Sequence, residues 1–476
     1  MTDPANLELT GGEMRELAEL TLSRVIAHLE SLPTQPASGD VRAEALCREM
    51  REAPPLTPSP LGPLLDDLFE RWIPRSFTAP GPGYLAYIPG GGLFPAALAD
   101  FISNAVNRFT GIWQAAPALV QLEANALDWL RQWMEFPQGS RGLFTTGGSM
   151  ANFNAILCAR ERLGTDIRSG TLYTSSQVHH SVLKSARLAG IFGDRVREID
   201  VDDDFRLRLD ALETAVADDR GAGLRPFMLV STAGTTNTGA VDPLDACGDF
   251  CRREGLWHHV DGAYGAFFYL VPEMRGPLRG LPEADSLTLD PHKGLFLPYG
   301  TGALLVRDGR ALRVAHALPH TAGYLPDMPD ADEFYDPSSH GPDLSRGFPG
   351  LRVWLCVKLF GEEKLRAAIA EKRALAVEAA GRLERVRGLR MIARPQLSLF
   401  AFYVTWPGAR RDEENAATTE LLARVTSRGR VMLTGCTVDG RVLARVCVLG
   451  FRTRQDRIDA CVEDVTEVTE ELLAAR

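Results

Sequence analysis

A chain of 476 residues is too long for one simple core, and its 45% hydrophobic and 24% charged residues are close to the averages of globular proteins. Its net charge of -10 argues against nucleic acid or an anionic membrane surface as the main partner. The N-terminal residues lack a basic segment followed by an apolar one, and no segment is apolar for long enough to span a bilayer. We therefore expect a cytoplasmic protein.

Eight cysteines are scattered along the chain, without a Cys-x-x-Cys pair or a histidine at zinc-finger spacing. Cys247 and Cys251 are four residues apart on an expected helix, where two thiols on one face are more often packing residues than half of a metal site. We expect reduced cysteines and no metal ion.

The N-terminal part of the chain is predicted to be helical. Residues 12–31 carry apolar side chains at helical spacing, and Pro-rich segments follow at 32–40 and 52–63. Short helices joined by proline-rich linkers bury little apolar surface of their own. The sequence therefore predicts an N-terminal helical arm, residues 1–80, that packs on another surface such as a partner subunit.

Helical and β-rich segments alternate from about residue 117. A helix is expected at 117–134, and strands are expected at 143–146, 171–174, 227–231, 257–260, 286–289 and 302–306. This alternation predicts an α/β domain over residues 81–350 with a mostly parallel sheet.

The C-terminal part begins after an irregular segment. Residues 318–350 are rich in Pro, Asp and Ser and predict a long loop. A helix expected at 351–386, strands expected at 397–404 and 442–451, and a last helix predict a small α/β C-terminal domain, residues 351–476.

Polar residues follow several of the expected strands, and open α/β sheets bind ligands beyond the carboxyl ends of their strands. Gly147, Gly148 and Ser149 stand between a strand and a helix, where backbone N–H groups can hold a phosphate, although alone this pattern is more often a simple helix cap. His179 follows the next strand and can stack on a flat ring, although a lone histidine there is more often a capping or surface residue.

Three further segments complete the set. Asp261 ends a strand, with Ala263 leaving room for a planar ligand, and Thr236 follows another strand. Lys293 lies between two apolar segments, where burial is expected to lower its pKa and suit the amine to forming an imine. Pyridoxal phosphate needs a lysine, a carboxylate at its pyridine nitrogen, a phosphate cradle and a flat neighbour. The sequence supplies all four.

Four motifs carry a family resemblance: "TTGGSMAN", "VHHSV", "HVDGAYGA" and "DPHK", with further similarity in "YLAYIPGGGLFPAALADF". With these motifs, over about residues 70–460, the chain resembles the group II pyridoxal-phosphate-dependent amino acid decarboxylases. These include the aromatic L-amino acid, tyrosine, histidine and glutamate decarboxylases, on the fold-type I, aspartate aminotransferase-like scaffold. The resemblance implies a seven-stranded, mostly parallel sheet, pyridoxal 5'-phosphate as cofactor, a homodimer, and decarboxylation of an L-amino acid to the amine and CO₂.

The resemblance also implies roles for single residues. Lys293 forms the imine with the cofactor, Asp261 pairs with the pyridine nitrogen and His179 stacks on the ring. The expected cofactor-binding residues are Gly148, Ser149, His179, Thr236, Asp261, Ala263, His292 and Lys293.

Two residues depart from the family pattern. Many relatives have Asn in place of Asp290 and a bulky aromatic residue in place of Gly294. An ionised Asp290 would repel a phosphate, and Gly294 suggests a different pocket wall.

A tyrosine on a mobile loop is expected, in this family, to return a proton to the α-carbon after CO₂ leaves. Tyr335 is the first candidate and Tyr324 the second, so the expected catalytic residues are Lys293, His179 and Tyr335.

The substrate is expected to contact Tyr87 and Ile88, because the segment "YLAYIPGGG" resembles the substrate side of aromatic amino acid decarboxylases more than that of glutamate decarboxylases. This favours an aromatic or bulky apolar amino acid, although the glycines at 90–92 could open the pocket to an unusual one. An aldehyde synthase is the alternative, which Phe in place of Tyr335 would signal. A transaminase or carbon–sulfur lyase fits the motifs less well, and a cofactor-free scaffold protein would need Lys293 or Asp261 to be missing.

Overall fold

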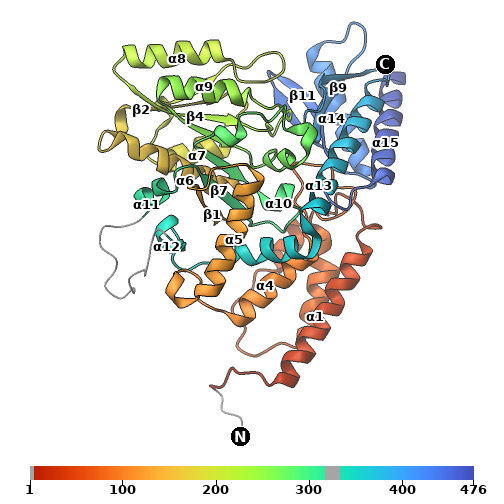
Figure 1. Cartoon of the computed structure of the whole chain (residues 1–476). Helices are drawn as coiled ribbons and strands as arrows, with labels where there is room; N and C mark the ends of the chain where they lie inside the picture. The colour runs from red at the N-terminus through yellow and green to blue at the C-terminus, as the bar shows by residue number, and fades with distance from the viewer. Residues whose placement is uncertain (1–4, 317–332) are drawn as a thin grey trace.

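The central feature of the computed structural model, which describes residues 5–316 and 333–476, is a seven-stranded sheet in the order β1-β7-β6-β5-β4-β2-β3. Its strands are β1 (Arg141–Thr145), β2 (Gly170–Ser175), β3 (Val196–Ile199), β4 (Arg225–Thr232), β5 (Trp257–Asp261), β6 (Ser286–Leu289) and β7 (Gly302–Val306). Of these seven, only β7 runs antiparallel to its neighbours, so the expected mostly parallel sheet is confirmed (Figure 1). The sequence did not predict β3, a short edge strand with partly exposed side chains.

Helices cover both faces of this sheet, as a mostly parallel sheet requires (Figure 1). On one face lie α6 (Gly148–Arg160), α7 (His180–Leu188) and α11 (Arg310–His316), which share a hydrophobic cluster with the sheet. On the other face lie α8 (Leu209–Gly221), α9 (Leu244–Glu254) and the predicted helix α5 (Pro117–Trp133). Both faces of the sheet are buried. Polar groups can therefore face a ligand only from the loops at the carboxyl ends of the parallel strands.

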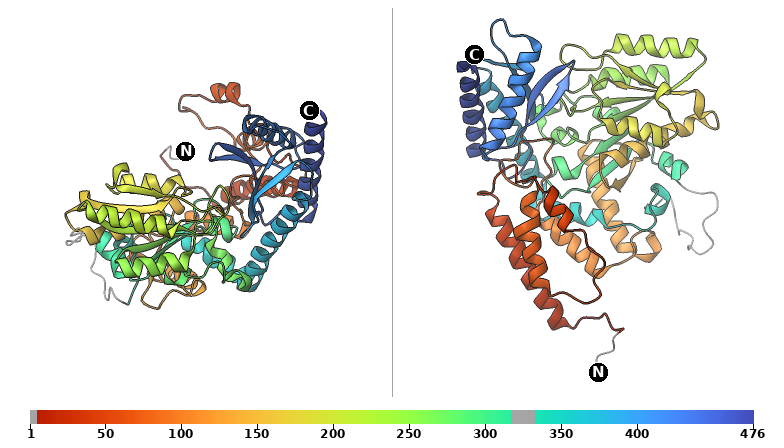
Figure 2. Two further views of the ribbon diagram at one scale, coloured as in Figure 1. Left: turned by 90° about the horizontal axis from the view of Figure 1, so that it is seen from above. Right: turned by 180° about the vertical axis from the view of Figure 1, so that it is seen from behind.

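A second, four-stranded antiparallel sheet follows, in the order β10-β11-β9-β8. Its strands are β8 (Leu389–Ala393), β9 (Leu399–Val404), β10 (Thr434–Val438) and β11 (Arg441–Cys447). The helices α13 (Pro349–Leu383), α14 (Arg411–Ser427) and α15 (Gln455–Ala474) pack on it around a separate hydrophobic cluster (Figure 2). The small α/β unit is therefore present, with β8, β10 and α14 as elements that the sequence did not predict. The predicted domain boundaries stay predictions.

The N-terminal residues form helices, as the sequence predicted. The helix α1 (Gly11–Ser31) begins with a capping box in which the side chains of Thr10 and Glu13 each accept a hydrogen bond from the backbone N–H of the other. It contains no buried residue and extends away from the body of the protein (Figures 1 and 2). The remaining α-helices of the described residues are α2 (Glu44–Glu49), α3 (Leu61–Asp66), α4 (Phe94–Val106), α10 (Pro291–Gly294) and α12 (Pro337–His340).

The state of the cysteines and the hydrophobicity of the helices were both predicted from the sequence. All eight cysteines are free thiols, and all but Cys47 and Cys436 are buried. None of the helices in the described part of the chain combines the length and the hydrophobicity that a bilayer crossing requires.

Candidate active site

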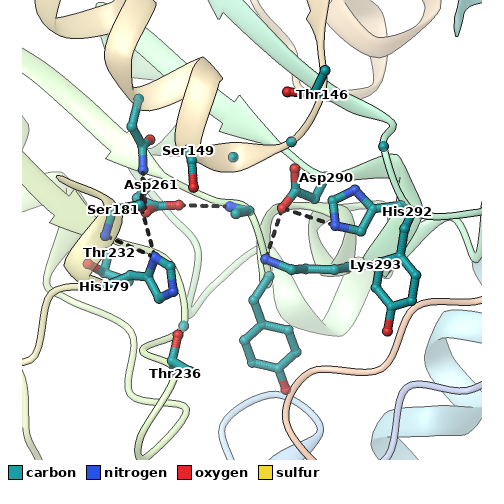
Figure 3. A pocket seen from close by; sticks show the side chains of 18 residues that line it. Thr146, Ser149, His179, Ser181, Thr232, Thr236, Asp261, Asp290, His292 and Lys293 are labelled. Atoms are coloured by element: carbon teal, nitrogen blue, oxygen red, sulfur yellow. Dashed lines mark hydrogen bonds and ion pairs between the residues drawn. The ribbon is translucent and has the colours of Figure 1, made fainter. Parts of the chain in front are cut away.

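A cavity of about 430 Å³ lies at the carboxyl ends of the parallel strands (Figure 3). Loops after β1, β2, β4, β5 and β6 form its walls. All eight residues expected to bind the cofactor line it: Gly148, Ser149, His179, Thr236, Asp261, Ala263, His292 and Lys293. The strand order thus brings together segments that are up to 145 residues apart in the sequence.

One end of the cavity is formed by the N-terminus of α6, a helix of 13 residues. The first N–H groups of a helix have no acceptor within the helix and can donate to an anion. Glycine is required here: Gly147 has a φ of 150°, and a side chain on Gly148 would meet Ala263 at 3.0 Å and Asp290 at 3.1 Å. The loop therefore offers backbone donors in a space that side chains would fill.

Lys293 projects into the cavity from α10 and forms an ion pair with Asp290 (Figure 3). The distance from Lys293 Nζ to Asp290 Oδ2 is 2.8 Å, because residues three apart lie on the same side of a helical turn. Burial alone would lower the pKa of Lys293, but the charge and hydrogen bond of Asp290 outweigh burial and raise it. The expectation of a lowered pKa is therefore wrong, since it considered the apolar neighbours and not this carboxylate.

Asp290 itself is buried, and its second oxygen, Oδ1, accepts no hydrogen bond from any described residue. Its Oδ2 also lies 3.6 Å from His292 Nε2, while His292 Nδ1 is 2.8 Å from the carbonyl oxygen of Thr301. Burial lowers the pKa of His292. Asp290 thus lies between the glycine loop at the start of α6 and Lys293, and its charge acts on both.

Asp261 lies at the end of β5 on the far side of the cavity from Asp290 (Figure 3). Its Oδ1 accepts a hydrogen bond of 3.1 Å from the backbone N–H of Ala263, and its Oδ2 accepts one of 2.9 Å from Asn152 Nδ2. Hydrogen bonds donated to a carboxylate stabilise its charge. The site therefore presents a buried carboxyl group whose two oxygens both accept hydrogen bonds, which is the kind of group that a pyridine nitrogen would need.

His179 begins α7, where its Nδ1 accepts a hydrogen bond of 3.3 Å from the N–H of Ser181 and lies 2.8 Å from the Ser181 hydroxyl. The capping interpretation is therefore confirmed, and the same histidine lines the cavity, while its stacking on a ring stays a prediction. Burial lowers the pKa of His179, which keeps the ring neutral near pH 7.

Gly294 does not line the cavity. A side chain on Gly294 would meet the ring of Phe267 at 2.6 Å, so Phe267 occupies the space that a larger residue at position 294 would need. The expectation that Gly294 changes the pocket wall is therefore wrong, because this glycine changes the packing against Phe267 outside the cavity.

Tyr335 lies apart from this cavity. It is buried, with its ring 5.1 Å from the ring of His340, and lines a second cavity of about 240 Å³ with Asp128 and Arg131. Burial raises its pKa, so the phenol keeps its proton. In this arrangement Tyr335 cannot reach the site of Lys293. Tyr324 lies outside the described residues.

The expected substrate residues lie near the cavity without lining it. Tyr87 is 51% exposed, and its N–H donates to Thr434 Oγ1 at 3.1 Å. Ile88 is partly buried against the main hydrophobic cluster. The segment continues to Gly90, whose N–H donates to the hydroxyl of Tyr299 at 3.2 Å, and Tyr299 does line the cavity.

Two further residues of the cavity wall, Asn152 and Tyr299, were not predicted from the sequence. Asn152 follows Gly148 by one helical turn, so the spacing could have placed it on the side of α6 that faces the site. Tyr299 comes six residues after Lys293, and no periodic pattern marks it.

Comparisons with known proteins agree with this geometry. A model of the pyridoxal-dependent decarboxylase conserved domain matches residues 45–405. The chain is 32% identical to the aromatic-L-amino-acid decarboxylase of Bacillus atrophaeus, over 98% of both chains. It is similar to the solved structure of Oryza sativa TDC with PLP and tryptamine, with 26% identity, a TM-score of 0.92 and 99% of both chains covered. It is also similar to Rhodiola rosea 4-hydroxyphenylacetaldehyde synthase, with 25% identity, a TM-score of 0.89 and coverage of 98% of this chain and 99% of that one.

The residues of the cavity fit pyridoxal 5'-phosphate. The glycine loop at the start of α6 is open to a phosphate, Lys293 supplies the amine, and Asp261 supplies a buried carboxylate that already accepts two hydrogen bonds. Each of these groups is one that the cofactor requires of a protein.

The Asp290→Asn substitution is expected to lower the pKa of Lys293, because the amide keeps the shape of the side chain and removes its charge. More Lys293 is then neutral and nucleophilic near pH 8. The rate at which the full chain, stripped of cofactor, captures added pyridoxal phosphate should therefore reach its plateau at a lower pH than in the wild type. Stopped-flow absorbance over a pH series measures this.

The matched control is Asp285→Asn, which makes the same change just before β6 rather than just after it. Asp285 accepts a hydrogen bond from the N–H of His258, and it does not line the cavity. A pH profile for Asp290→Asn that coincides with those of the wild type and of Asp285→Asn would show that the ion pair does not set the charge of Lys293.

Proposed function

Because the chain belongs to the pyridoxal-dependent decarboxylase family and is a PLP-dependent amino acid decarboxylase, we propose that its substrate is an aromatic L-amino acid and its product is the amine. The observation that carries the substrate proposal is an exposed aromatic ring in the cavity wall. Tyr299 lines the cavity and is 57% exposed, and its hydroxyl accepts a hydrogen bond from the N–H of Gly90. Aromatic rings at a binding site favour an aromatic ligand, because rings pack edge to face or offset against one another.

The distribution of cations supports the same substrate class. Among the described residues that line the cavity, Lys293 is the only lysine or arginine. A substrate with a second carboxylate, such as glutamate, would find no further cation in the cavity wall. This favours an uncharged side chain.

Arg445 is a buried cation just outside the wall. Its guanidinium donates hydrogen bonds to the backbone carbonyl groups of Thr236, Asn237 and Tyr87, all of them uncharged acceptors. A buried guanidinium gains most from a charged partner. We therefore assign to Arg445 the attraction of the substrate's α-carboxylate towards the cavity.

The roles of the remaining residues follow from their positions. The cofactor, when bound, supplies an electron-accepting ring that takes up the electron pair left on the substrate's α-carbon when CO₂ departs. Lys293 would hold the cofactor through its side-chain amine, and Asp261 would keep a proton at the ring nitrogen. Gly148 and Ser149 would bind the phosphate at the N-terminus of α6, and His179 would cover the ring and exclude water.

The test of this function is a panel of L-amino acids scored for CO₂ release and for the organic product. Tryptophan, tyrosine and phenylalanine should be decarboxylated, and glutamate should not. Lys293→Ala should remove both turnover and the visible absorbance of the bound cofactor, while the melting temperature stays near that of the wild type, because the reactive amine goes and little packing does. Turnover by Lys293→Ala at the wild-type rate would refute the assignment.

An aldehyde product is the second candidate, because the chain is about as similar to the solved structure of a 4-hydroxyphenylacetaldehyde synthase as to that of a decarboxylase. The presence of tyrosine at position 335 supports the amine. The panel separates the two products, since an aldehyde synthase consumes oxygen and releases ammonia together with CO₂.

The proton donor to the substrate carbon is proposed to be Tyr335, which requires the segment around it to leave its own cavity. Tyr335→Phe should slow amine formation on the order of 10²-fold, the usual scale for losing a general acid, while substrate binding is kept. Aldehyde and ammonia should rise as the amine falls. Rates of amine and aldehyde formation, measured by chromatography, test this.

Two further substitutions test whether another tyrosine is the proton donor. Tyr324→Phe removes the hydroxyl of the second tyrosine proposed from the sequence, and Tyr299→Phe removes that of the tyrosine that lines the cavity. Loss of amine formation in either of these with a normal rate in Tyr335→Phe would move the role to that residue. Normal rates in all three would refute a tyrosine donor.

We propose that the chain forms a homodimer through its N-terminal helices. On α1, Leu17 and Leu20 lie on one side of the helix and Leu22 and Ile26 on the other, and all four are exposed. A helix that is apolar on more than one side is normally buried. On α4 the exposed side chains include that of Phe101, which is 63% exposed. A second copy of the chain would cover both helices.

The paired substitution Leu17→Glu with Leu20→Glu is expected to shift the protein from dimer to monomer, because each change places a charge in the contact. Sedimentation velocity at micromolar concentration measures this. Glu16→Gln with Glu19→Gln on the same helix is the matched control and should remain dimeric. A monomeric wild type would refute the proposal.

A cytoplasmic location is proposed on one further ground. The eight free thiols, none of them in a disulfide, suit a reducing compartment.

A further inference from the structure

A row of buried polar side chains leads from Asp261 and Asn152, which line the cavity, into the interior of the protein. Trp257 Nε1 donates to the hydroxyl of Ser286 at 2.7 Å, and that hydroxyl is 2.8 Å from His259 Nδ1. His259 Nε2 is 3.0 Å from Asn152 Oδ1, and Asn152 Nδ2 donates to Asp261 at 2.9 Å. Trp257, His259 and Asp261 alternate along β5, so their side chains lie on the same face of the sheet.

The two ends of this row fix the direction of every hydrogen bond in it. The indole N–H of Trp257 can only donate, and an ionised Asp261 carboxylate can only accept. The Asn152 amide must therefore turn its NH₂ group to Asp261 and its oxygen to His259. His259 then carries its hydrogen on Nε2, and its Nδ1 accepts from the Ser286 hydroxyl. Each group donates towards Asp261.

The carbonyl oxygen of Asn152 has a second donor, the hydroxyl of Thr288 at 2.6 Å. The amide oxygen thus accepts from both His259 and Thr288. If the amide were rotated by half a turn, its NH₂ group would face these two donors and its oxygen would face the Asp261 carboxylate. That arrangement would leave buried polar groups without partners, which costs more than a single hydrogen bond contributes. The amide is therefore held in one orientation.

We propose that His259 is a positioning residue: by donating its Nε2–H to Asn152 it holds the Asn152 amide against Asp261, and so fixes the carboxylate that serves the cofactor's ring nitrogen. The proposal rests on the role given above to Asp261. His259 is fully buried and, unlike Asn152 and Asp261, is not among the described residues of the cavity wall. Burial lowers its pKa to about 4, so it is neutral at physiological pH, as this tautomer requires.

The neighbouring residue, His258, provides a matched control. It is equally buried on the same strand, and its side chain points to the opposite face of the sheet, where its Nε2 is 2.7 Å from the Ser231 hydroxyl. Burial lowers its pKa to about 3. It takes no part in the hydrogen bonds that reach Asp261.

The experiment compares His259→Leu, His259→Gln and His258→Leu in the holoenzyme. Equilibrium dialysis gives the Kd for pyridoxal phosphate, and a pH titration of the visible absorbance band reports the environment of the bound ring. His259→Leu should weaken cofactor binding about tenfold or more and shift the titration of the band, because the Asn152 oxygen loses a donor. His259→Gln, whose amide can donate from a similar position, should restore most of both properties. His258→Leu should lower the melting temperature and leave both properties within about twofold of the wild type.

Thr288→Val tests the same amide oxygen with a smaller change of shape and serves if His259→Leu does not fold. It should weaken cofactor binding in the same direction. Equal effects of His258→Leu and His259→Leu on the band and the Kd would show that His259 acts only through packing and would overturn the proposal. So would a normal Kd and band in both His259→Leu and Thr288→Val.

Asp261→Asn separates this proposal from the role of Asp261. If Asp261→Asn keeps the Kd and the band of the wild type, the pairing of Asp261 with the ring is wrong, and the proposal fails with it. If Asp261→Asn loses both while His259→Leu behaves like His258→Leu, the pairing stands and the role of His259 alone is refuted.

Discussion

The common direction of β1, β2, β4, β5 and β6 is the constraint on which the site depends. Parallel strands end at one edge of the sheet, so the residues that follow each strand meet there whatever their distance in the sequence. Helices bury both faces, which leaves this edge as the place where polar side chains can face a ligand. Asp261 at the end of β5 and Lys293 in α10, which follows the neighbouring strand β6, consequently line the same cavity.

The balance of charge in the cavity follows from this crowding. Asp290 and Asp261 both act to raise the pKa of Lys293, and burial lowers the pKa values of His179 and His292. The cavity thus contains two carboxylates, one ammonium group and neutral imidazoles. A phosphate adds negative charge to this set. Its binding must depend on the backbone N–H groups at the start of α6, since the lysine is already shared with Asp290.

The parts that could be predicted from the sequence are those with a local signal. A Gly-Gly-Ser segment between a strand and a helix, or a charged residue after an apolar run, reveals a strand end and its chemistry without knowledge of the fold. The parts that could not be predicted depend on distant packing. Asp290 reverses the expected pKa shift of Lys293, Phe267 fills the space beside Gly294, and Tyr335 lies in a different cavity. The edge strand β3 is too short and too exposed to give an apolar pattern.

The two sides of the cavity differ in how firmly they are held. Behind Asp261 each polar group has a partner, and Asn152 is fixed by His259 and Thr288, so the carboxylate has one position. On the side that we propose to hold the substrate, the side chains of Tyr87 and Tyr299 are half exposed, and the Tyr299 hydroxyl accepts a hydrogen bond from the N–H of Gly90. A ring nitrogen must meet its carboxylate in one geometry for the electron pair to be accepted, whereas substrates differ in their side chains. The hydrogen-bonded residues around Asp261 are therefore rigid, while the exposed rings on the other side of the cavity can adapt. This difference lets one fold keep the same cofactor chemistry while relatives differ in substrate and product.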